Sequence, residues 1–177
     1  MLADLTDKAA VADQVQQAQA DTVVHLAAIS FVGNADDAAF YSVNVTGCIN
    51  LLNACAALPQ KPRKVLLASS ANIYGNANEG VLHETQAPAP ENEYAVSKLA
   101  MEHLARTYAD RLPLVLTRPF NYTGAGQGSQ FLIPKLVDHF VRKAPRIELG
   151  NLDVEREFND VRMVCDAYLS LLDRGQP

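Results

Sequence analysis

The amino-acid sequence predicts an α/β fold built on a parallel β-sheet. Three short segments, 22–26, 65–68 and 114–117, are almost continuously apolar, as expected of strands that are buried on both faces. Longer segments with apolar residues at helical spacing separate them. This alternation of strands and helices is typical of a parallel sheet with helices on both faces.

Five segments are expected to be helices. Their apolar residues recur every three or four positions, and Thr6 or Asp7 can cap the first of them. Pro59 and Pro62 end the second, because proline cannot continue a helix. In chain order the predicted helices are 8–20, 40–58, 94–111, 132–143 and 161–174.

A fourth strand is expected over 146–149, after the three apolar ones. Ligands of a parallel sheet bind beyond the carboxyl ends of its strands. Each of the first three strands is followed there by small or polar residues, namely Ala27 and Ala28, Ser69 and Ser70, and Arg118, Pro119 and Asn121. Residues 30–39 and 76–90 are expected to be loops.

Composition narrows the class of protein. The chain has 177 residues, 49% hydrophobic and 20% charged, which fits one globular domain with a core. Its net charge of -5 argues against nucleic acid as a partner. No apolar run approaches the roughly 18 residues of a membrane helix, and a signal-peptide pattern is missing, so we expect no membrane partner and a cytoplasmic location. Cys48, Cys55 and Cys165 are expected to be buried thiols, and the scattered histidines predict no metal site.

Tyr94 and Lys98 are the candidates for proton transfer. Four residues are about one helical turn, so both side chains lie on one face of the predicted helix. A phenol has a pKa of about 10, and a nearby ammonium brings it toward the range of general acid and base catalysis. Ser70 could bond a substrate hydroxyl or carbonyl. The alternatives are an ordinary surface pair and a turn serine; together the three residues suit hydride transfer at a secondary alcohol or ketone.

The chain resembles the extended short-chain dehydrogenases/reductases that act on nucleotide sugars, from about Asp4 to Leu172. The resemblance implies a Rossmann-like doubly wound parallel sheet. The motifs that carry it follow the family's order: Asp4 with Asp7, His25-Leu26-Ala27-Ala28, Asn44, Ser70 to Gly75, Tyr94 to Lys98, Arg118 to Asn121, and Arg156 to Val161.

The resemblance also implies a role for each matching residue. Tyr94 is the general acid/base, Lys98 binds the nicotinamide ribose and lowers the pKa of Tyr94, and Ser70 polarises the sugar oxygen. Arg156 pairs with the diphosphate, for which its planar fork is suited. The implied contacts to NAD or NADP are Asp4 and Leu5 at the adenine end, then Leu26, Ala27, Ala28, Asn44, Ala68, Tyr94, Lys98 and Pro119. The implied contacts to a nucleotide-sugar substrate are Ser70, Asn72, Asn121 and Arg156.

Two residues narrow the expected reaction. Dehydratases of this family carry carboxylates just after the catalytic serine or threonine, where this chain has Ala71 and Asn72. An amide exchanges no proton at neutral pH, which favours reduction or epimerisation over elimination. The segment 118–135 looks most like the GDP-sugar enzymes, which implies reduction of GDP-4-keto-6-deoxy-mannose to GDP-rhamnose with NAD(P)H. The alternatives are a 4-epimerase with bound NAD and an inactive truncated fragment; the choice between NAD and NADP stays open.

The chain departs from the family in its glycines. The family begins with a glycine-rich turn that holds the cofactor pyrophosphate, whereas Gly33, Gly47 and Gly75 are isolated. We therefore expect an internal fragment that binds NADPH weakly or not at all. It is expected to be a single partial domain, 1–177, in which 124–177 begins the substrate-binding part. Glu157 replaces a usual aspartate, and the resemblance implies a homodimer through helices 40–58 and 94–111.

Overall fold

The structure is a computed structural model that describes residues 2–30, 36–76, 80–150, 152–153 and 155–175. Gly33, which the sequence analysis singled out, lies outside these residues. The chain divides into two compact units, Met1–Pro119 with Ser170–Pro177, and Phe120–Leu169. The expected single partial domain, with a substrate-binding part from residue 124, stays a prediction.

The first unit is built on a three-stranded parallel sheet, as predicted. Its strands are β1 (Thr22–His25), β2 (Lys64–Ala68) and β3 (Leu114–Thr117), in the order β1-β2-β3. The register pairs His25 with Leu67 and Ala68 with Thr117. The carboxyl ends of all three strands therefore meet at one edge of the sheet, where the candidate residues follow them.

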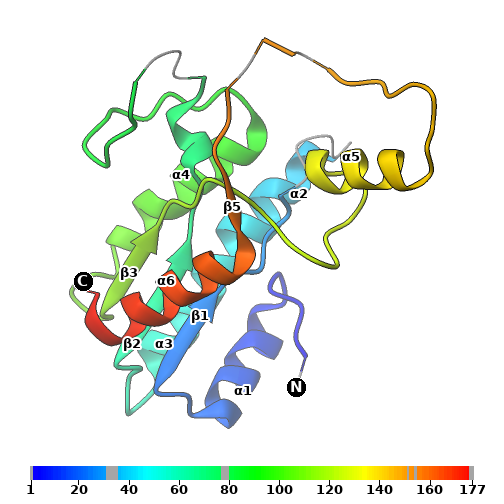
Figure 1. Ribbon diagram of the computed structural model, residues 1–177. Helices are drawn as coiled ribbons and strands as arrows, with labels where there is room; N and C mark the ends of the chain where they lie inside the picture. Colours follow the sequence, from blue (N-terminus) through cyan, green and yellow to red (C-terminus); the bar gives the residue numbers. More distant parts are fainter. Residues whose placement is uncertain (1, 31–35, 77–79, 151, 154, 176–177) are drawn as a thin grey trace. The chain divides into compact units, whose positions relative to one another are not determined.

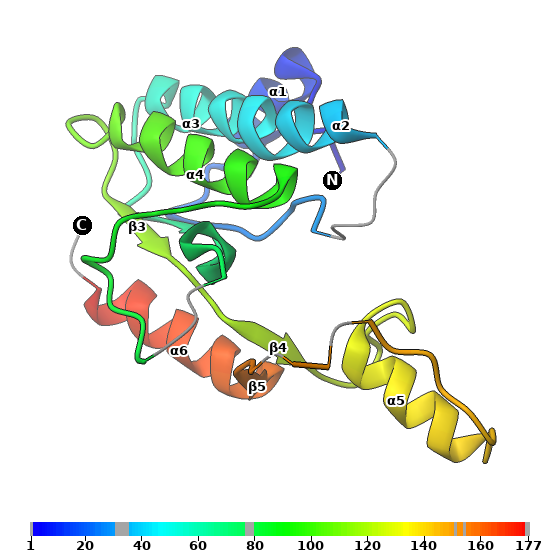
Figure 2. The same cartoon turned by 90° about the horizontal axis from the view of Figure 1, so that it is seen from above.

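Helices α1 to α4 lie on one face of this sheet (Figures 1 and 2). The side chain of Asp7, one of the two predicted caps, accepts hydrogen bonds from the first turn of α1. The helical elements of this unit before α6 are α1 (Lys8–Ala18), α2 (Asp37–Tyr41), the π-helical segment η1 (Ser42–Gly47), α3 (Cys48–Ala57), the 3₁₀ turn η2 (Ala71–Tyr74) and α4 (Glu93–Arg106).

Two predicted helix boundaries are wrong. The helix predicted over 40–58 begins three residues earlier, at Asp37, because Asp36 caps it, and its middle is a π-helix. The helix predicted to reach Arg111 ends at Arg106. Thr107 closes its last turn there, since its backbone N–H and its side-chain hydroxyl both bond the carbonyl of Leu104.

The core of the first unit lies between α3, α4 and the sheet. Its buried residues are Cys48, Leu52, Cys55, Val65, Leu67, Met101, Ala105, Tyr108, Leu112 and Leu114. Burial raises the pKa of the Cys48 thiol to about 12 and that of Cys55 to about 11, so both stay protonated near neutral pH. Cys165 is exposed, so its predicted burial is wrong; it lies on α6, a helix that buries none of its residues.

The second unit contains two strands that the sequence analysis missed. β4 (Asn121–Thr123) and β5 (Phe158–Asp160) pair in parallel, with Asn121 opposite Phe158. The strand predicted over 146–149 is wrong. These residues have no partner strand among those the structure describes, and the Glu148 carbonyl accepts a hydrogen bond from the Lys135 side chain instead.

Helices α5 (Leu132–Val141) and α6 (Val161–Arg174) agree with the predicted segments to within two residues. Among the described residues, no helix combines the length and the apolar composition that a membrane span requires.

Candidate active site

Helix α4 carries the two residues that the sequence singled out. Asn92 caps the helix by accepting a hydrogen bond of 2.9 Å from the Ala95 N–H, which sets the helix start just before Tyr94. Tyr94 is 9% exposed and Lys98 4% exposed. The Tyr94 ring packs against Phe40 of α2, with ring centroids 6.3 Å apart. The pair is therefore buried on the inner face of α4 and is not an ordinary surface pair.

Lys98 reaches the carboxyl end of β2. Its Nζ donates a hydrogen bond of 2.7 Å to the Ala68 carbonyl, the last of that strand. Burial lowers the pKa of Lys98 to about 8, and Cys48 counteracts this only in part. Burial and then the charge of Lys98 lower the pKa of His25, at the end of β1, to about 4. At neutral pH the end of the sheet thus holds a charged lysine beside a neutral histidine.

Ser70 lies just beyond β2, where the pairing with β3 continues past the strand ends. The Ser69 N–H donates to the Thr117 carbonyl at 2.8 Å and the Ala71 N–H to the Pro119 carbonyl at 3.0 Å. Ser70 Oγ accepts a hydrogen bond of 3.2 Å from the Asn72 N–H, so this serine also caps η2. Both sequence interpretations of Ser70, the turn serine and the site residue, are compatible with this position.

Asn44, a predicted cofactor contact, joins the segment after β1 to α4. It is 1% exposed. Its Oδ1 accepts from the Ile29 N–H at 2.9 Å, and its Nδ2 donates to the Ile29 carbonyl and to Ser97 Oγ, both at 3.0 Å. Ser97 Oγ in turn donates to the Tyr94 carbonyl at 2.8 Å. Sequence reasoning missed Ser97, although its place between Tyr94 and Lys98 was visible.

The segment that Asn44 holds contains three predicted cofactor contacts. Leu26 is 55% exposed, Ala27 is exposed and Ala28 is half-buried. Small or exposed residues beyond a strand end leave the backbone accessible to a ligand.

A second polar pair adjoins the first on α4. Glu102, fully buried, accepts two hydrogen bonds from Arg118, from Nε at 2.9 Å and from Nη2 at 2.6 Å. Burial is the largest single influence on the pKa of Glu102 and acts to raise it, but the hydrogen bonds from Arg118 and Ser69 and the charges of Arg118 and Arg106 together outweigh burial, and the pKa is lowered. The hydrogen bonds to Glu102 likewise raise the pKa of Arg118. Glu102 lies four residues after Lys98, a spacing that could have revealed it.

Asp4 and Leu5, the predicted contacts to the adenine end, form a local turn. Asp4 Oδ1 accepts from the N–H and the hydroxyl of Thr6, both at 2.8 Å, and these bonds lower the pKa of Asp4. A Cβ on Gly47 would lie 2.8 Å from the Leu5 Cβ, so this glycine gives Leu5 room. Gly75 has a φ of 68° and faces the Ala89 carbonyl. Both glycines therefore have packing roles.

Asn121 and Arg156 belong to the second unit. The pairing of β4 with β5 brings them near each other, since Asn121 Nδ2 donates to the carbonyl of Glu157, next to Arg156, at 3.2 Å. Arg156 is exposed, and its Nη1 donates to the Glu155 carbonyl at 2.9 Å. The use of these residues together with Tyr94 stays a prediction, as do the predicted contacts of Asn72, which is exposed, and Pro119, which is half-buried.

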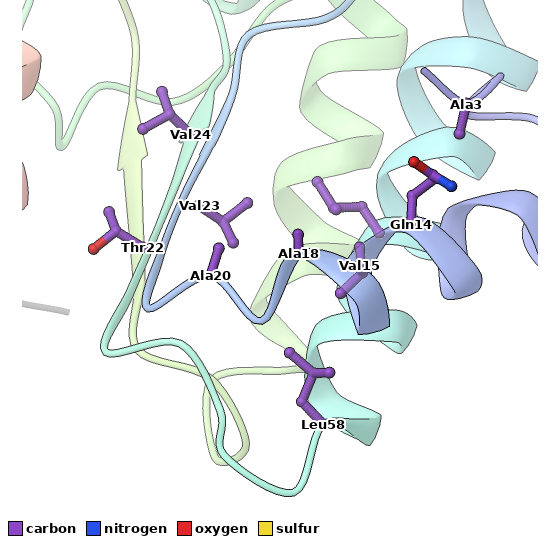
Figure 3. Close-up of a pocket in the computed structure, with 10 residues that line it drawn as sticks. Ala3, Gln14, Val15, Ala18, Ala20, Thr22, Val23, Val24 and Leu58 are labelled. Atoms are coloured by element: carbon purple, nitrogen blue, oxygen red, sulfur yellow. The ribbon is translucent and has the colours of Figure 1, made fainter. Parts of the chain in front are cut away.

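A cavity of about 330 Å³ in the first unit is lined mainly by residues of α1, β1 and α3. In Figure 3, Val15 and Ala18 of α1 lie close to Ala20 and to Val23 of β1, with Leu58 below them. The lining is mostly apolar and includes no residue that was predicted to bind cofactor or substrate.

Comparison with known proteins gives a consistent result. Residues 1–177 match the sequence model of a family described as GDP-mannose 4,6 dehydratase. The chain is 40% identical to GDP-6-deoxy-D-talose 4-dehydrogenase of Aggregatibacter actinomycetemcomitans, over 97% of the chain and 58% of that protein. It is 38% identical to GDP-6-deoxy-D-mannose reductase of Pseudomonas aeruginosa, over 88% of the chain and 55% of that protein.

Solved structures support the Rossmann-like fold. A Burkholderia cenocepacia protein, provisionally described as an epimerase, has a TM-score of 0.91 and 56% identity over 98% of this chain and 55% of its own. RMD from Pseudomonas aeruginosa, complexed with NADPH, has a TM-score of 0.89 and 35% identity over 99% of this chain and 63% of its own. The chain spans little more than half the length of the curated relatives it matches.

Proposed function

We propose that this chain, which belongs to the GDP-mannose 4,6-dehydratase family, is part of a nucleotide-sugar oxidoreductase in which Tyr94 transfers the proton. The observation that carries the proposal is the buried Tyr94–Lys98 pair, with Lys98 held on the Ala68 carbonyl at the end of the sheet. A fixed ammonium beside a phenol favours the phenolate and so makes Tyr94 a better proton donor and acceptor.

The residues at the end of the sheet suit the nicotinamide end of NAD or NADP. Lys98 has three N–H donors, and Ala68 O is its one hydrogen-bond acceptor among the described residues, which leaves donors for ribose hydroxyls. Ala27 and Ala28 leave space beside the backbone, and we infer that Asp4 and Leu5 lie at the adenine end. The relative that is complexed with NADPH supports the same class of cofactor. When bound, this cofactor supplies or accepts the hydride.

The proposed reaction is reduction of the C4 ketone of GDP-4-keto-6-deoxy-mannose to GDP-rhamnose. Tyr94 gives its proton to the C4 oxygen as the carbon receives the hydride, and Ser70 holds that oxygen by a hydrogen bond. Asn121 and Arg156 bind the diphosphate. Two relatives named for GDP-6-deoxy sugars support this substrate class. Asn72, which cannot exchange a proton at neutral pH, supports reduction over elimination.

A second candidate is reduction of the same ketone to the 6-deoxy-talose product. Mannose and talose differ only in the configuration at C4, so the face that receives the hydride decides between them. The 40% identity to GDP-6-deoxy-D-talose 4-dehydrogenase favours this candidate.

The test is an assay of the full protein with GDP-4-keto-6-deoxy-mannose and either NADH or NADPH. Oxidation of the cofactor is followed by absorbance, and the C4 configuration of the product is read by NMR. Tyr94→Phe should lower kcat by about 10² to 10⁴, whereas Tyr41→Phe should not, because the Tyr41 hydroxyl bonds Glu93 at the surface. Most turnover remaining in Tyr94→Phe would refute the role of Tyr94.

Two results would favour the alternatives. Stoichiometric NAD released from the denatured protein would favour a 4-epimerase. Failure of the unmodified protein to react with either cofactor would favour an inactive chain.

We also infer a homodimer through η1, α3 and α4, and a cytoplasmic location.

A further inference from the structure

Lys98 lies between two partners on α4. Tyr94, Lys98 and Glu102 follow one another on one face of the helix at intervals of four residues. Lys98 therefore has a phenol about one turn before it and a carboxylate about one turn after it. Opposite charges at this spacing attract, and they attract more strongly when they are buried, because less water screens them.

The structure nevertheless keeps Lys98 and Glu102 apart. Lys98 Nζ bonds the Ala68 carbonyl at 2.7 Å, and no ion pair joins it to a carboxylate within the described part of the chain. Each oxygen of Glu102 instead accepts a hydrogen bond from the guanidinium of Arg118. Arg106 approaches the same carboxylate from the exposed side, at 3.9 Å.

Arg118 is itself held from three sides. It directly follows β3, its Nη1 donates to the Tyr74 hydroxyl of η2 at 2.7 Å and to the Glu84 carbonyl at 3.1 Å, and its guanidinium carbon lies 5.3 Å from the centroid of the Tyr74 ring. The planar guanidinium can make all these bonds while it keeps both Glu102 oxygens occupied. A lysine at this position could not.

We propose that Arg118 is a positioning residue, which occupies the Glu102 carboxylate so that the Lys98 ammonium stays on the Ala68 carbonyl, about one helical turn from Tyr94. The proposal rests on the proposed function in taking Tyr94 as the proton-transfer residue. Without Arg118, Lys98 and Glu102 pair along α4, and Tyr94 loses the positive charge beside it.

Other titratable groups near this network do not replace Glu102 as a partner of Lys98. His25 of β1 and the two thiols of α3, Cys48 and Cys55, are neutral at neutral pH, with pKa values of about 4, about 12 and about 11. Further titratable side chains lie on α4 itself and on the other elements that pack against it. Those that the structure describes are Asp37 and Tyr41 of α2, Tyr74 of η2, and Glu93, His103 and Arg106 of α4. Glu93 bonds Tyr41 at the surface, and η1 contributes no titratable side chain.

The test measures the ionisation of Tyr94 in the full protein without substrate or cofactor. Tyrosinate absorbance is measured as a function of pH in each variant. The same titration is made of that variant with Tyr94→Phe in addition, and the difference between the two curves reports the ionisation of Tyr94. Arg118→Met should raise the pKa of Tyr94 by about 1 to 3, the effect of losing a nearby opposite charge. The double variant Arg118→Met/Glu102→Gln should restore it, because no carboxylate is left to capture Lys98. Arg106→Met, which removes the more distant arginine, is the matched control and should change nothing.

Two outcomes would overturn the proposal. One is a Tyr94 pKa that does not change in Arg118→Met. The other is a shift of the Tyr94 pKa in the double variant that equals the shift in the single variant, which is the result expected if the ion pair between Arg118 and Glu102 is merely structural. If Arg118→Met does not fold, Arg118→Gln, which keeps a hydrogen-bond donor but carries no charge, gives the same comparison with and without Glu102→Gln. The titration involves no turnover, so its result does not depend on activity. If the protein shows the predicted shift of the Tyr94 pKa but no reductase activity, the proposed function is refuted and the role of Arg118 stands.

Discussion

Replacing Lys98 with methionine should stabilise the folded protein at pH 7 while it removes catalysis. Burial lowers the pKa of Lys98 from 10.5 to about 8, so the folded state disfavours the charged form. One unit of pKa difference corresponds to about 1.4 kcal/mol, which makes this penalty about 3 kcal/mol where the lysine is charged in both states. Methionine removes the penalty and keeps most of the side-chain volume.

The sign of the pH dependence follows from linkage. Below pH 8, Lys98 is protonated in both states and the full penalty applies. Between pH 8 and about 10.5 the unfolded chain binds the extra proton, so the stability of the unmodified protein should rise relative to the variant. The pKa values of the Cys48 and Cys55 thiols lie above this range in the folded state and within it when unfolded. The effect of Cys55 is common to both proteins and cancels in the difference, whereas Cys48 interacts with Lys98 and adds a smaller contribution to it.

The assay is urea denaturation of both proteins at several pH values from 7 to 10.5. The free energy of unfolding of Lys98→Met should exceed that of the unmodified protein at pH 7, and the difference should shrink by about 3 kcal/mol toward pH 10.5. Lys64→Met is the control, since Lys64 lies at the amino end of β2, where its Nζ bonds the Gly175 carbonyl. A difference that does not vary with pH would refute the reasoning that Lys98 is charged and desolvated.

Three further predictions test the scaffold. Asn44→Ala removes three hydrogen bonds and should lower the free energy of unfolding by about 3 kcal/mol, against about 2 kcal/mol for Ser97→Ala, which removes two; equal losses would contradict the linking role of Asn44. Gly75→Ala should lower the urea midpoint more than Gly80→Ala, because both have positive φ but only the first would place a Cβ 2.1 Å from a backbone carbonyl. Val96→Glu, on the exposed side of α4, should convert the inferred dimer to a monomer in light scattering, and a monomeric unmodified protein would refute the dimer.

The strands of the first unit could be predicted because each is a short run that is almost continuously apolar. Observed and predicted strand ends agree to within one residue for all three. The π-helical turn around Asn44 could not be predicted, because a local change of helical pitch leaves no distinct spacing of apolar residues. Strands β4 and β5 were missed because each is three residues long and pairs with a distant segment. The run 146–149 alternates like a strand but has no partner among the described residues.

In the candidate site, too, the features with a local sequence signal could be predicted, and those that depend on distant segments could not. The spacing of Tyr94 and Lys98 indicated a shared face, and the structure adds that this face is buried. The acceptor for Lys98 could not be predicted, since it is the backbone carbonyl of Ala68 and any residue type carries one. Glu102 has a visible spacing, but its partner Arg118 comes from beyond the next strand, so only the fold brings the two together.

These contacts make the chemistry of α4 depend on the register of the sheet. Lys98 is anchored at the end of β2 and Glu102 by the residue after β3, and these two anchors lie side by side because Ala68 pairs with Thr117. A slip of one residue between β2 and β3 would move Arg118 about 3.3 Å along the strand, more than a hydrogen bond tolerates. The apolar runs that bury β2 and β3 oppose such a slip. The residues that hold the charges of the site in place are therefore, in the first instance, the aliphatic side chains of these two strands.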